Sequence, residues 1–464
     1  MTSPADLAPL GAIATASAIA DGKVSARAVI DHALERIGAE NTRLHAFIAV
    51  TSDEARAEAD MLDALQAKGH RRGPFHGVPL AVKDIIDVSG QKTRAGSVTR
   101  DHLGPASADA WCVARLRAAG AVVVGKTNTV EYAFGGWGTN VIAGTPVNPH
   151  DRKVHRVPGG SSSGSGVAVG AGLVPLAFGT DTGGSVRLPA AWCGLVGHKT
   201  SYGLISRSGV VPLALAFDTI GPMTRTVRDA AVMAQVMLGS DPTDASTTGA
   251  PGLDLVTGLE AGVKGLTLGL LDLGGLTVDP EVAAAIDASA KALEKAGARI
   301  VRVTLPETVS AYTGLCGALM MVEGYSRYGK LADADPCLVG APVAGRMRGG
   351  KAISGPAYFD AVEARIQRIA SANAALDGID ALILPTTLFT AIPVSEVDED
   401  GAPGGLTRFV NYLEWCGVSV PVAKSRAGMP IGLQVVARRY RDDLALRIAR
   451  AAELAAGGPL ALPA

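Results

Sequence analysis

Serines set among glycines occur in two nearby segments, and a serine hydroxyl is a possible nucleophile. The run GGSSSGSG spans Gly159 to Gly166, and Ser185 follows in the stretch GTDTGGSVRLP. A serine becomes an effective nucleophile only when a base takes its proton, and that base is most often histidine. All eight histidines of this chain lie at or before His198. The sequence therefore raises the question of which group activates a serine here.

Histidine-based and metal-based chemistry have little support in this pattern. His198, in GLVGHKTSYG, is the histidine nearest the serine segments, and we interpret it as structural rather than as a catalytic base. The chain has no HExxH and no HxH motif, so we predict no metal and no cofactor. GSSSG matches the nucleophile-elbow pattern with Ser162 at its centre. An elbow needs a strand leading into the serine, and the preceding segment is polar and interrupted by Pro158.

A lysine can replace histidine as the base if its pKa falls from about 10.4 to near 7. Burial lowers the pKa of a lysine, whereas neighbouring carboxylates raise it. Lys83, in GVPLAVKDIIDV, follows an apolar predicted strand, so its side chain is a candidate to enter an apolar cleft. Asp84 is adjacent, but neighbours on an extended chain point to opposite faces. The alternative is an ordinary surface lysine at a strand end.

The segment GAVVVGKT, Gly120 to Thr127, matches the phosphate-loop pattern GxxxxGK[ST]. A phosphate loop needs flexible backbone between its glycines. The residues Ala-Val-Val-Val instead favour a buried strand, because β-branched side chains stiffen the chain. A nucleotide-binding protein that uses Lys126 is therefore the weakest of three functional hypotheses.

The order of several long motifs resembles the amidase signature family. They are GVPLAVKDIIDV, GKTN, PGGSSSGSG, GTDTGGSVRLPAAWCGLVGHKTSYG and SRSGVVPLALAFDTIGPMTRTVRDAA, nearly unbroken from Gly77 to Ala231. Weaker similarity continues in DALILPTT and MPIGLQVVARR. The resemblance implies one α/β domain over residues 1–464, with a central mixed sheet covered by helices on both faces. Its signature core would span about residues 77–231.

The resemblance also implies a Ser-Ser-Lys mechanism and assigns each role by motif position. The nucleophile is then Ser185, the bridging serine is Ser161, usually preceded by a cis peptide, and the base is Lys83. The backbone amides before the nucleophile are expected to form an oxyanion hole from Thr182, Gly183 and Gly184, together with the amide of Ser185 itself. Residues expected to support this shell through hydrogen bonds are Ser162, Asp181 and Arg187.

Two other segments are expected near the substrate. By resemblance the loop TVEYAFGGWGTN faces the substrate, with Phe134, Gly135 and Gly136 lining the pocket. Tyr132 and Trp137 lie nearby in the sequence and are equally well explained as core residues. The stretch NYLEWCG, residues 411–417, occupies a position where Glu414, Trp415 and Cys416 would help to shape the pocket.

The remaining chain reads as alternating helices and strands. Residues 1–70 are predicted to be mostly helical, and VSARAVIDHALERI follows a plausible N-cap, Ser25. A strand at 264–273, a helix from Pro280 and a strand in ARIVRVTL form a strand–helix–strand unit, which favours a parallel or mixed sheet. The segment 330–356 is the least regular and is predicted to be a surface loop or cover.

Composition limits the classes of partner. Hydrophobic residues make up 48% and charged residues 19% of the 464 residues, and the formal net charge is -1. This gives no electrostatic case for nucleic acid or an anionic membrane, so we predict neither as a partner. The five cysteines are widely spaced and are interpreted as reduced and buried, as in a soluble cytoplasmic protein. A homodimer is expected only from the family resemblance.

Three functions remain open at this point. The first is hydrolysis of the C–N bond of a small-molecule amide through a Ser185 acyl-enzyme, with Lys83 and Ser161 moving the protons. The alternative is a glutaminase-like amidotransferase subunit that passes ammonia to a partner protein. The third is the nucleotide-binding protein described above. The sequence does not choose the amide, because related folds host many substrates.

Overall fold

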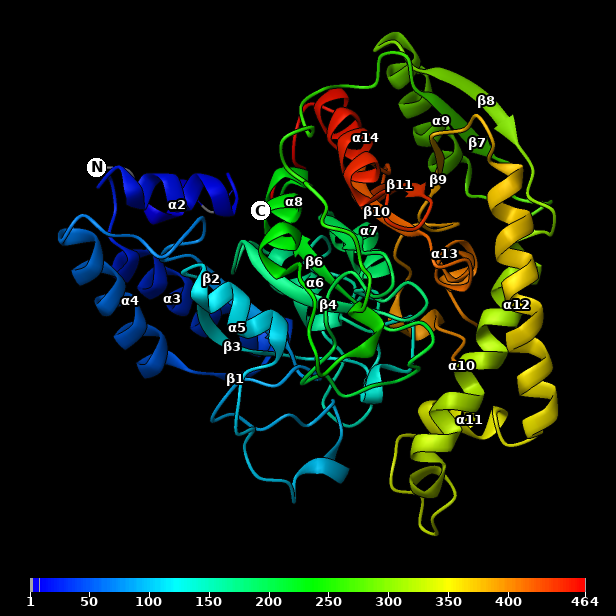
Figure 1. The fold of residues 1–464 in the computed structure, drawn as a ribbon. Helices are drawn as coiled ribbons and strands as arrows, with labels where there is room; N and C mark the ends of the chain where they lie inside the picture. The colour runs from blue at the N-terminus through cyan, green and yellow to red at the C-terminus, as the bar shows by residue number, and fades with distance from the viewer. Residues whose placement is uncertain (1–2, 8, 464) are drawn as a thin grey trace.

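A single mixed sheet of 11 strands runs through the protein, and helices pack on both of its faces (Figure 1). The computed structural model describes residues 3–7 and 9–463. In their order across the sheet, the strands are β1 (Phe47–Val50), β3 (Val122–Thr127), β2 (Pro79–Lys83), β4 (Leu176–Asp181), β6 (Thr219–Thr224), β5 (Val196–Lys199), β10 (Cys416–Lys424), β11 (Pro430–Ala437), β9 (Ala381–Pro385), β7 (Thr267–Leu271) and β8 (Arg299–Val303). The predicted α/β class with a central mixed sheet is confirmed.

The helices alternate with these strands along much of the chain. They are α1 (Pro4–Leu7), α2 (Ala12–Ala20), α3 (Ala26–Leu44), α4 (Ser52–Ala67), α5 (Trp111–Ala118), α6 (Ser163–Gly170), α7 (Arg187–Cys193), α8 (Val227–Met237), α9 (Pro280–Lys295), α10 (Val309–Ala332), α11 (Ala341–Gly349), α12 (Gly355–Ala375), α13 (Arg408–Tyr412) and α14 (Asp442–Ala455). Short 3-10 turns include η2 (Glu131–Ala133) and η5 (Gly404–Leu406). The N-terminal segment is helical as predicted, and Ser25 caps α3 by accepting a hydrogen bond from the Ala28 N–H.

Alternation along the central strands explains why both sheet faces are covered. On β3, Val123 joins the apolar cluster that includes α5 and α8, whereas Val122 and Val124 join the cluster formed with α3, α4 and α6. Successive side chains of a strand point to opposite faces, so a strand that is apolar throughout needs a layer of helices on each side. All six residues of β3 are buried. The GAVVVGKT segment is therefore a core strand, as its β-branched residues predicted.

Parallel pairing brings the ends of three strands together near the middle of the sheet. Strand β2 pairs in parallel with both β3 and β4, while β4 pairs antiparallel with β6. The carboxyl ends of β2 and β4 therefore lie at the same edge, and the loops that follow them meet there. At the far end of the sheet, β7, α9 and β8 form the predicted strand–helix–strand unit with parallel strands.

The segment 330–356 differs from its sequence prediction. Instead of an irregular loop it contains the end of α10 and the helix α11, which packs against α10 beside α12 (Figure 1). The many glycines and arginines of this stretch make its helical pattern hard to recognise in the sequence. The helix nevertheless has a short apolar face, formed by Val343, Ala344 and Met347. Within the described residues, no helix is long and apolar enough to cross a membrane.

Candidate active site

Lys83 is the last residue of β2, and its side chain is fully buried. Its Nζ donates hydrogen bonds to Ser161 Oγ and to Thr180 Oγ1, each at 2.8 Å. Burial lowers the pKa of Lys83 to about 7, and this outweighs the attraction of Asp181 and Asp218, which raises it. A lysine with such a pKa is substantially neutral at physiological pH and can accept a proton. The sequence argument for a desolvated Lys83 therefore agrees with the geometry.

Ser161 lies two residues before α6, where the chain passes between the loop after β3 and the nucleophile loop. The Gly160–Ser161 peptide bond is cis, as the resemblance implied. The Ser161 carbonyl accepts hydrogen bonds from Thr129 Oγ1 at 2.9 Å and from the Val130 N–H at 3.1 Å. These two contacts fix the backbone from which Oγ reaches Lys83.

Ser185 lies between the end of β4 and the start of α7, and it is 8% exposed. Its carbonyl accepts a hydrogen bond of 3.3 Å from the Ser162 N–H, which joins the two serine segments. Ser185 opens into a hollow of about 440 Å³ that includes space open to solvent. The residues lining it are Ala133, Phe134, Gly135, Gly136, Thr182, Gly183, Ser185, Leu188, Leu213, Met320, Arg346, Gly401, Ala402, Gly404 and Arg408.

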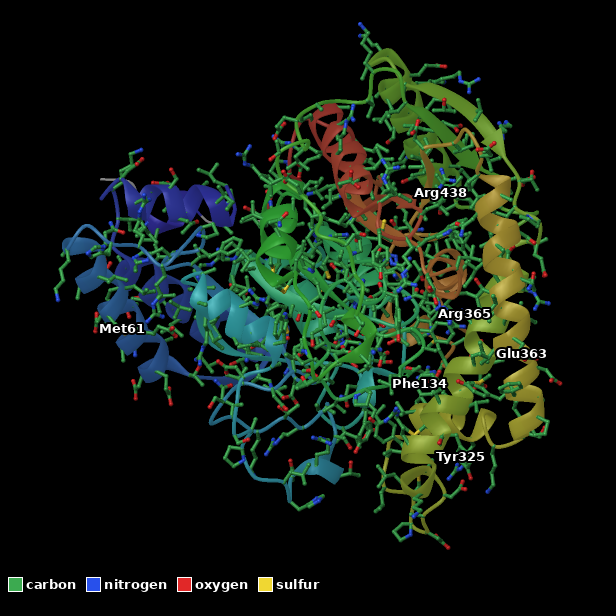
Figure 2. All side chains as sticks on the ribbon, viewed as in Figure 1. Met61, Phe134, Tyr325, Glu363, Arg365 and Arg438 are labelled. Atoms are coloured by element: carbon green, nitrogen blue, oxygen red, sulfur yellow. The ribbon has the colours of Figure 1, made fainter. Side chains whose placement is uncertain are left out.

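The three residues predicted to line the pocket do lie on this cavity. Phe134, Gly135 and Gly136 follow η2, and Phe134 packs close to α10 in the view of Figure 2. The two aromatic neighbours lie outside the cavity lining. Tyr132 packs against Tyr328 with ring centroids 4.2 Å apart, and Trp137 stacks on Trp192 at 5.8 Å. The interpretation of these two aromatics as core residues is the one that the structure supports.

The backbone before Ser185 turns sharply. Gly184 has φ +127°, which side chains rarely adopt, and its N–H donates to Asp181 Oδ1 at 2.7 Å. The Thr182 hydroxyl donates to Asp218 Oδ1 at 2.6 Å, so Thr182 is anchored by its side chain. The expected oxyanion set consisted of the amides of Thr182, Gly183, Gly184 and Ser185. The amide of Gly184 is instead engaged by a carboxylate, which removes it as a free donor.

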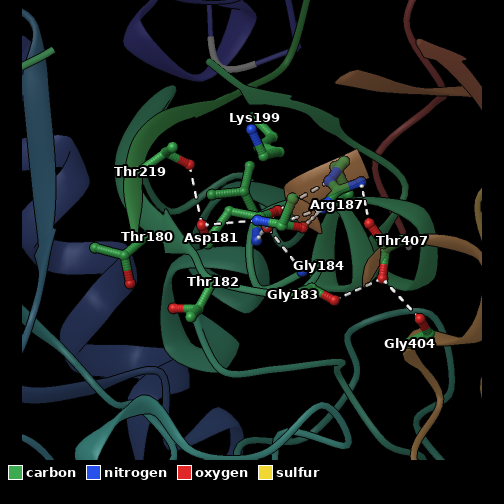
Figure 3. A network of polar contacts seen from close by, with 12 residues as sticks. Thr180, Asp181, Thr182, Gly183, Gly184, Arg187, Lys199, Thr219, Gly404 and Thr407 are labelled. Carbon is green, nitrogen blue, oxygen red and sulfur yellow. Dashed lines mark hydrogen bonds and ion pairs between the residues drawn. The ribbon is translucent and has the colours of Figure 1, made fainter. Parts of the chain in front are cut away.

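A buried polar network supports this turn from behind (Figure 3). Asp181 and Arg187 form an ion pair of 2.9 Å in which both side chains are fully buried. Arg187 also donates to the Thr407 carbonyl, to Gln434 Oε1 and to Asn411 Oδ1. Although burial acts to raise the pKa of Asp181, Arg187 and Lys199 hold it well below its usual range. The carboxylate is therefore ionised and orients the Gly184 and Val186 amides.

The alternative bases and nucleophiles are engaged elsewhere. His198, on β5, has its Nε2 3.0 Å from Asp442 Oδ1 at the start of α14, which fits the structural role expected for it. Ser162 is fully buried, and its Oγ donates to the Thr180 carbonyl at 3.4 Å. Lys126 is buried, donates to the Ile86 carbonyl and pairs with Asp84 at 3.3 Å. A lysine so engaged is not available to a nucleotide phosphate.

The Amidase family model matches residues 28–446 of this sequence. The chain belongs to the amidase family. Two relatives are both named as the same subunit of glutamyl-tRNA(Gln) amidotransferase. The one from Anaeromyxobacter dehalogenans is 37% identical and covers 100% of this chain and 99% of its own. The one from Acidobacterium capsulatum is 36% identical and covers 94% of this chain and 97% of its own.

Solved structures of amidase-family proteins share the whole fold. One is described as an unexpected vestigial protein complex that reveals the evolutionary origins of an s-triazine catabolic enzyme. It has a TM-score of 0.91 and 33% identity, and covers 98% of this amidase and 100% of its own chain. The native peptide amidase of Stenotrophomonas maltophilia has a TM-score of 0.87 and 31% identity, with 98% of each chain covered.

The relatives correct the prediction about partners. The sequence prediction that excluded nucleic acid as a partner is wrong. The relatives that match over the full length are named as one part of an enzyme acting on glutamyl-tRNA(Gln). The exclusion relied on a net charge of -1. Net charge governs non-specific attraction of one chain and says nothing of what the other members of an assembly bind.

Several site residues of this amidase were not found from its sequence. Thr180 accepts a hydrogen bond from Lys83. Arg187 donates to three residues that lie far from it in the sequence, namely Thr407, Asn411 and Gln434. Asn411 was the one with a signal, because it opens the NYLEWCG stretch.

The rest of that stretch does not shape the cavity. Glu414 pairs with Arg439 at 2.7 Å, the Trp415 indole donates to Asn373, and Cys416 begins the buried strand β10. The expectation that these three residues form part of the pocket is therefore wrong. The turn after α13 places Trp415 and Cys416 in the core and leaves Glu414 partly exposed, and Arg408, from the start of α13, lines the cavity.

Proposed function

We propose that the chain cleaves the C–N bond of a carboxamide through an acyl-enzyme on Ser185. The observation that carries this proposal is the 2.8 Å hydrogen bond between Lys83 Nζ and Ser161 Oγ, made by a lysine whose burial lowers its pKa to about 7. A neutral Lys83 can act as the base, Ser161 would relay the proton, and the cavity-lining Ser185 would be the nucleophile.

The steps follow from these positions. Neutral Lys83 takes the proton of Ser161 Oγ while Ser161 takes that of Ser185, and Ser185 Oγ adds to the amide carbon. The proton returns through Ser161 to the amide nitrogen, the C–N bond breaks, and ammonia or an amine leaves. Water then adds to the acyl ester by the same relay, the ester C–O bond breaks, and the carboxylic acid is released with Ser185 restored.

The tetrahedral intermediate needs donors for its oxyanion. We assign this role to the backbone amides of Thr182, Gly183 and Ser185, which line the cavity. Gly184 is left out because its N–H donates to Asp181. One such donor is typically worth about 3 kcal/mol of transition-state stabilisation. Arg187 and Ser162 act as positioning residues, through Asp181 and through the Ser185 carbonyl respectively.

For the fate of the ammonia, we propose that the chain serves as the amide-donor subunit of an amidotransferase. Support comes from relatives of that name at 36% and 37% identity, which match nearly the full length of this chain. In this role a partner protein would bring the acceptor, of the tRNA-linked kind that the relatives' name specifies. The chain alone would then hydrolyse its donor amide slowly, and addition of the partner and acceptor would accelerate ammonia release.

A second candidate is a self-sufficient amide hydrolase. The observation that favours it is the similarity to the solved peptide amidase, with a TM-score of 0.87 over 98% of both chains. The two candidates differ in a simple measurement on the purified chain without partners. A self-sufficient hydrolase should release ammonia from its preferred amide at about 1 s⁻¹ or faster, the lower end for typical enzymes. An amidotransferase component should remain well below that rate.

The chemistry common to both candidates is tested with a fluorophosphonate probe followed by peptide mass spectrometry. The wild-type chain should be labelled on Ser185, and Ser185→Ala should abolish labelling. Lys83→Ala should reduce the labelling rate by at least about 100-fold, because the base is missing. Label on Ser162, or undiminished labelling of Lys83→Ala, would overturn the proposed mechanism.

A further inference from the structure

The cavity beside Ser185 carries positive charge and no negative charge on its walls. Among its lining residues the charged ones are Arg346 and Arg408, and none is an aspartate or glutamate. The other lining residues are glycines, small or apolar side chains and hydroxyls. The charge in this cavity therefore depends on how far the two guanidinium groups are neutralised by their neighbours.

Arg346 is fully engaged by a surface segment. It donates to the Phe134 carbonyl at 3.0 Å, to the Glu399 carbonyl at 2.8 Å and to Glu399 Oε2 at 2.5 Å. The other carboxylate oxygen of Glu399 accepts from Thr139 Oγ1 at 2.6 Å. The charges of Arg346 and Glu399 therefore cancel within one ion pair, which holds the segment next to the cavity in place.

Arg408 has no such neighbour. Within the described residues its guanidinium makes neither a hydrogen bond nor an ion pair, and no carboxylate is among the groups that affect its pKa. Its pKa is lowered, chiefly by burial and further by the charge of Arg346. Arg408 is only partly exposed to solvent, at the cavity. A largely desolvated guanidinium without a counter-ion is costly, so its position at the cavity wall favours an anionic partner from outside the chain.

The structure holds Arg408 in this place. Its Cγ lies 3.1 Å from the point where a side chain on Gly183 would begin, so the stem packs against the nucleophile loop. Its Nη1 lies 3.4 Å from the corresponding point at Gly317 of α10. A side chain at Gly183 would crowd the arginine, whereas one at Gly317 would meet it at ordinary van der Waals contact. The glycines leave a slot in which the guanidinium reaches the cavity close to Ser185.

The carboxylates nearest this region are already occupied. Asp218 accepts hydrogen bonds from Thr182 Oγ1 and from the amides of Leu213 and Ala214. Asp181 accepts from Arg187 and from backbone amides behind the turn. Glu399 is paired with Arg346. None of these carboxylates is free to bind a cationic group of a substrate. The cavity therefore favours anionic substrate groups over cationic ones.

We propose that the amide cleaved at Ser185 bears a free carboxylate that binds the guanidinium of Arg408, and that it bears no ammonium group next to that carboxylate. The planar fork of arginine matches the two oxygens of a carboxylate. An α-ammonium would enter a cavity beside the unpaired guanidinium of Arg408, where no carboxylate among the lining residues could accept it. This inference rests on the proposed function of Ser185 and names its substrate class, the ω-amic acids. Glutaramate therefore fits better than glutamine, which is glutaramate with an α-ammonium.

The test compares ammonia release from succinamate, glutaramate and adipamate with release from their neutral diamides and from glutamine. The wild type should prefer the best amic acid over its diamide by about 10- to 100-fold in kcat/KM, the range for a hydrogen-bonded charged group. Arg408→Gln should lose that preference, so that the ratio of kcat/KM for the amic acid to kcat/KM for its diamide falls to about one. Arg408→Lys should keep part of it. Arg327→Gln, which removes an exposed positive charge on α10, should keep all of it.

A binding measurement separates this inference from the proposed chemistry. Ser185→Ala protein cannot form the acyl-enzyme, so calorimetry with glutaramate reports recognition alone. Binding should weaken at least about tenfold in Ser185→Ala with Arg408→Gln, and the Tm of Arg408→Gln without ligand should not fall, because an unpaired buried charge has been removed.

The possible failures are distinguishable. Unlabelled Ser185 with intact, Arg408-dependent binding of glutaramate would overturn the proposed chemistry and leave the recognition site standing. Equal turnover of amic acid and diamide by the wild type, an unchanged preference in Arg408→Gln, or faster turnover of glutamine than of glutaramate would each overturn the inference. A Tm loss in Arg408→Gln without any change in preference would show that Arg408 is structural.

Discussion

Lys83 Nζ and Thr180 Oγ1 lie 2.8 Å apart on two neighbouring parallel strands, β2 and β4. The Thr180 hydroxyl accepts one N–H of the lysine, and the Ser161 hydroxyl lies at the same distance on another side of the amine. A lysine with four rotatable bonds needs such a second anchor to keep its lone pair directed at one serine. Thr180 is in this sense a positioning residue for the base.

Thr180→Val removes the anchor and keeps the shape of the side chain. We expect kcat to fall about 10- to 100-fold with little change in KM, because the base is less well oriented while the cavity is unaltered. The conservative variant Thr180→Ser keeps the hydroxyl and should retain most of the rate. Thr224→Val, a buried threonine on the partner strand β6, is the control and should leave kcat within about twofold.

The activity should rise with pH through the pKa of Lys83. Because burial lowers this pKa to about 7, the fraction of neutral base falls about tenfold for each pH unit below that value. The logarithm of kcat/KM should therefore have a slope near one below pH 7 and a plateau above it. Lys199 also has a lowered pKa, to about 8, and Lys199→Met identifies the source of the inflection. If the inflection in the pH profile of kcat/KM disappeared in Lys199→Met, the profile would report Lys199, which would contradict its assignment to Lys83.

The stability of the chain should also depend on Lys83. Its pKa is about 7 in the folded protein and 10.5 without burial, so between these values the unfolded chain binds a proton that the folded chain does not. The free energy of unfolding should then rise with pH in that window, by about 1.4 kcal/mol per unit from this group. Urea denaturation of Lys83→Met at pH 7 and pH 9 should show a smaller increase than the wild type. An identical increase would mean that Lys83 is solvated in the folded state.

Asp181→Asn should be strongly destabilising. It leaves the fully buried guanidinium of Arg187 without its counter-ion, and breaking a buried pair typically costs about 3 to 5 kcal/mol. The free energy of unfolding from urea denaturation measures this loss. Asp31→Asn is the matched control, because Asp31 pairs with Arg27 and Arg56 on the exposed faces of α3 and α4. It should cost about 1 kcal/mol or less. Equal losses for the two variants would contradict the importance assigned to the buried pair.

Gly184→Ala should disable the nucleophile loop. The added Cβ would begin 2.2 Å from Thr407 Oγ1, and the φ of +127° is itself unfavourable for alanine. We expect the rate of Ser185 labelling by the fluorophosphonate probe to fall at least about 100-fold. Gly378→Ala is the control, since Gly378 also has a positive φ but open space around it, so it shows the effect of strain alone. Gly378→Ala should leave the labelling rate unchanged. Near-normal labelling of Gly184→Ala would contradict the claim that the turn at Gly184 must be this tight for Ser185 to react.

The strand–helix–strand unit is predicted from apolar periodicity and turn residues, because these are local signals. The full fold class and the role of Lys83 follow from the order of the family motifs, since an apolar strand that ends in lysine would alone indicate only a surface lysine. Thr180 and Arg408 are not readable in this way. Thr180 becomes relevant only when β4 pairs with β2, and Arg408 only when α13 places its stem against Gly183. Such long-range pairings leave no periodic trace in the chain.

The partners of Arg187 carry a consequence for the synthesis of this enzyme. Asn411 and Gln434 lie 224 and 247 residues further along the chain than the arginine that they bind. A ribosome that has translated only about the first 400 residues has made Lys83, Ser161 and Ser185 but not the groups that complete the shell behind them. Contacts of such high sequence separation form late. The nascent chain therefore carries the three reactive residues without an assembled active site until its last strands are made.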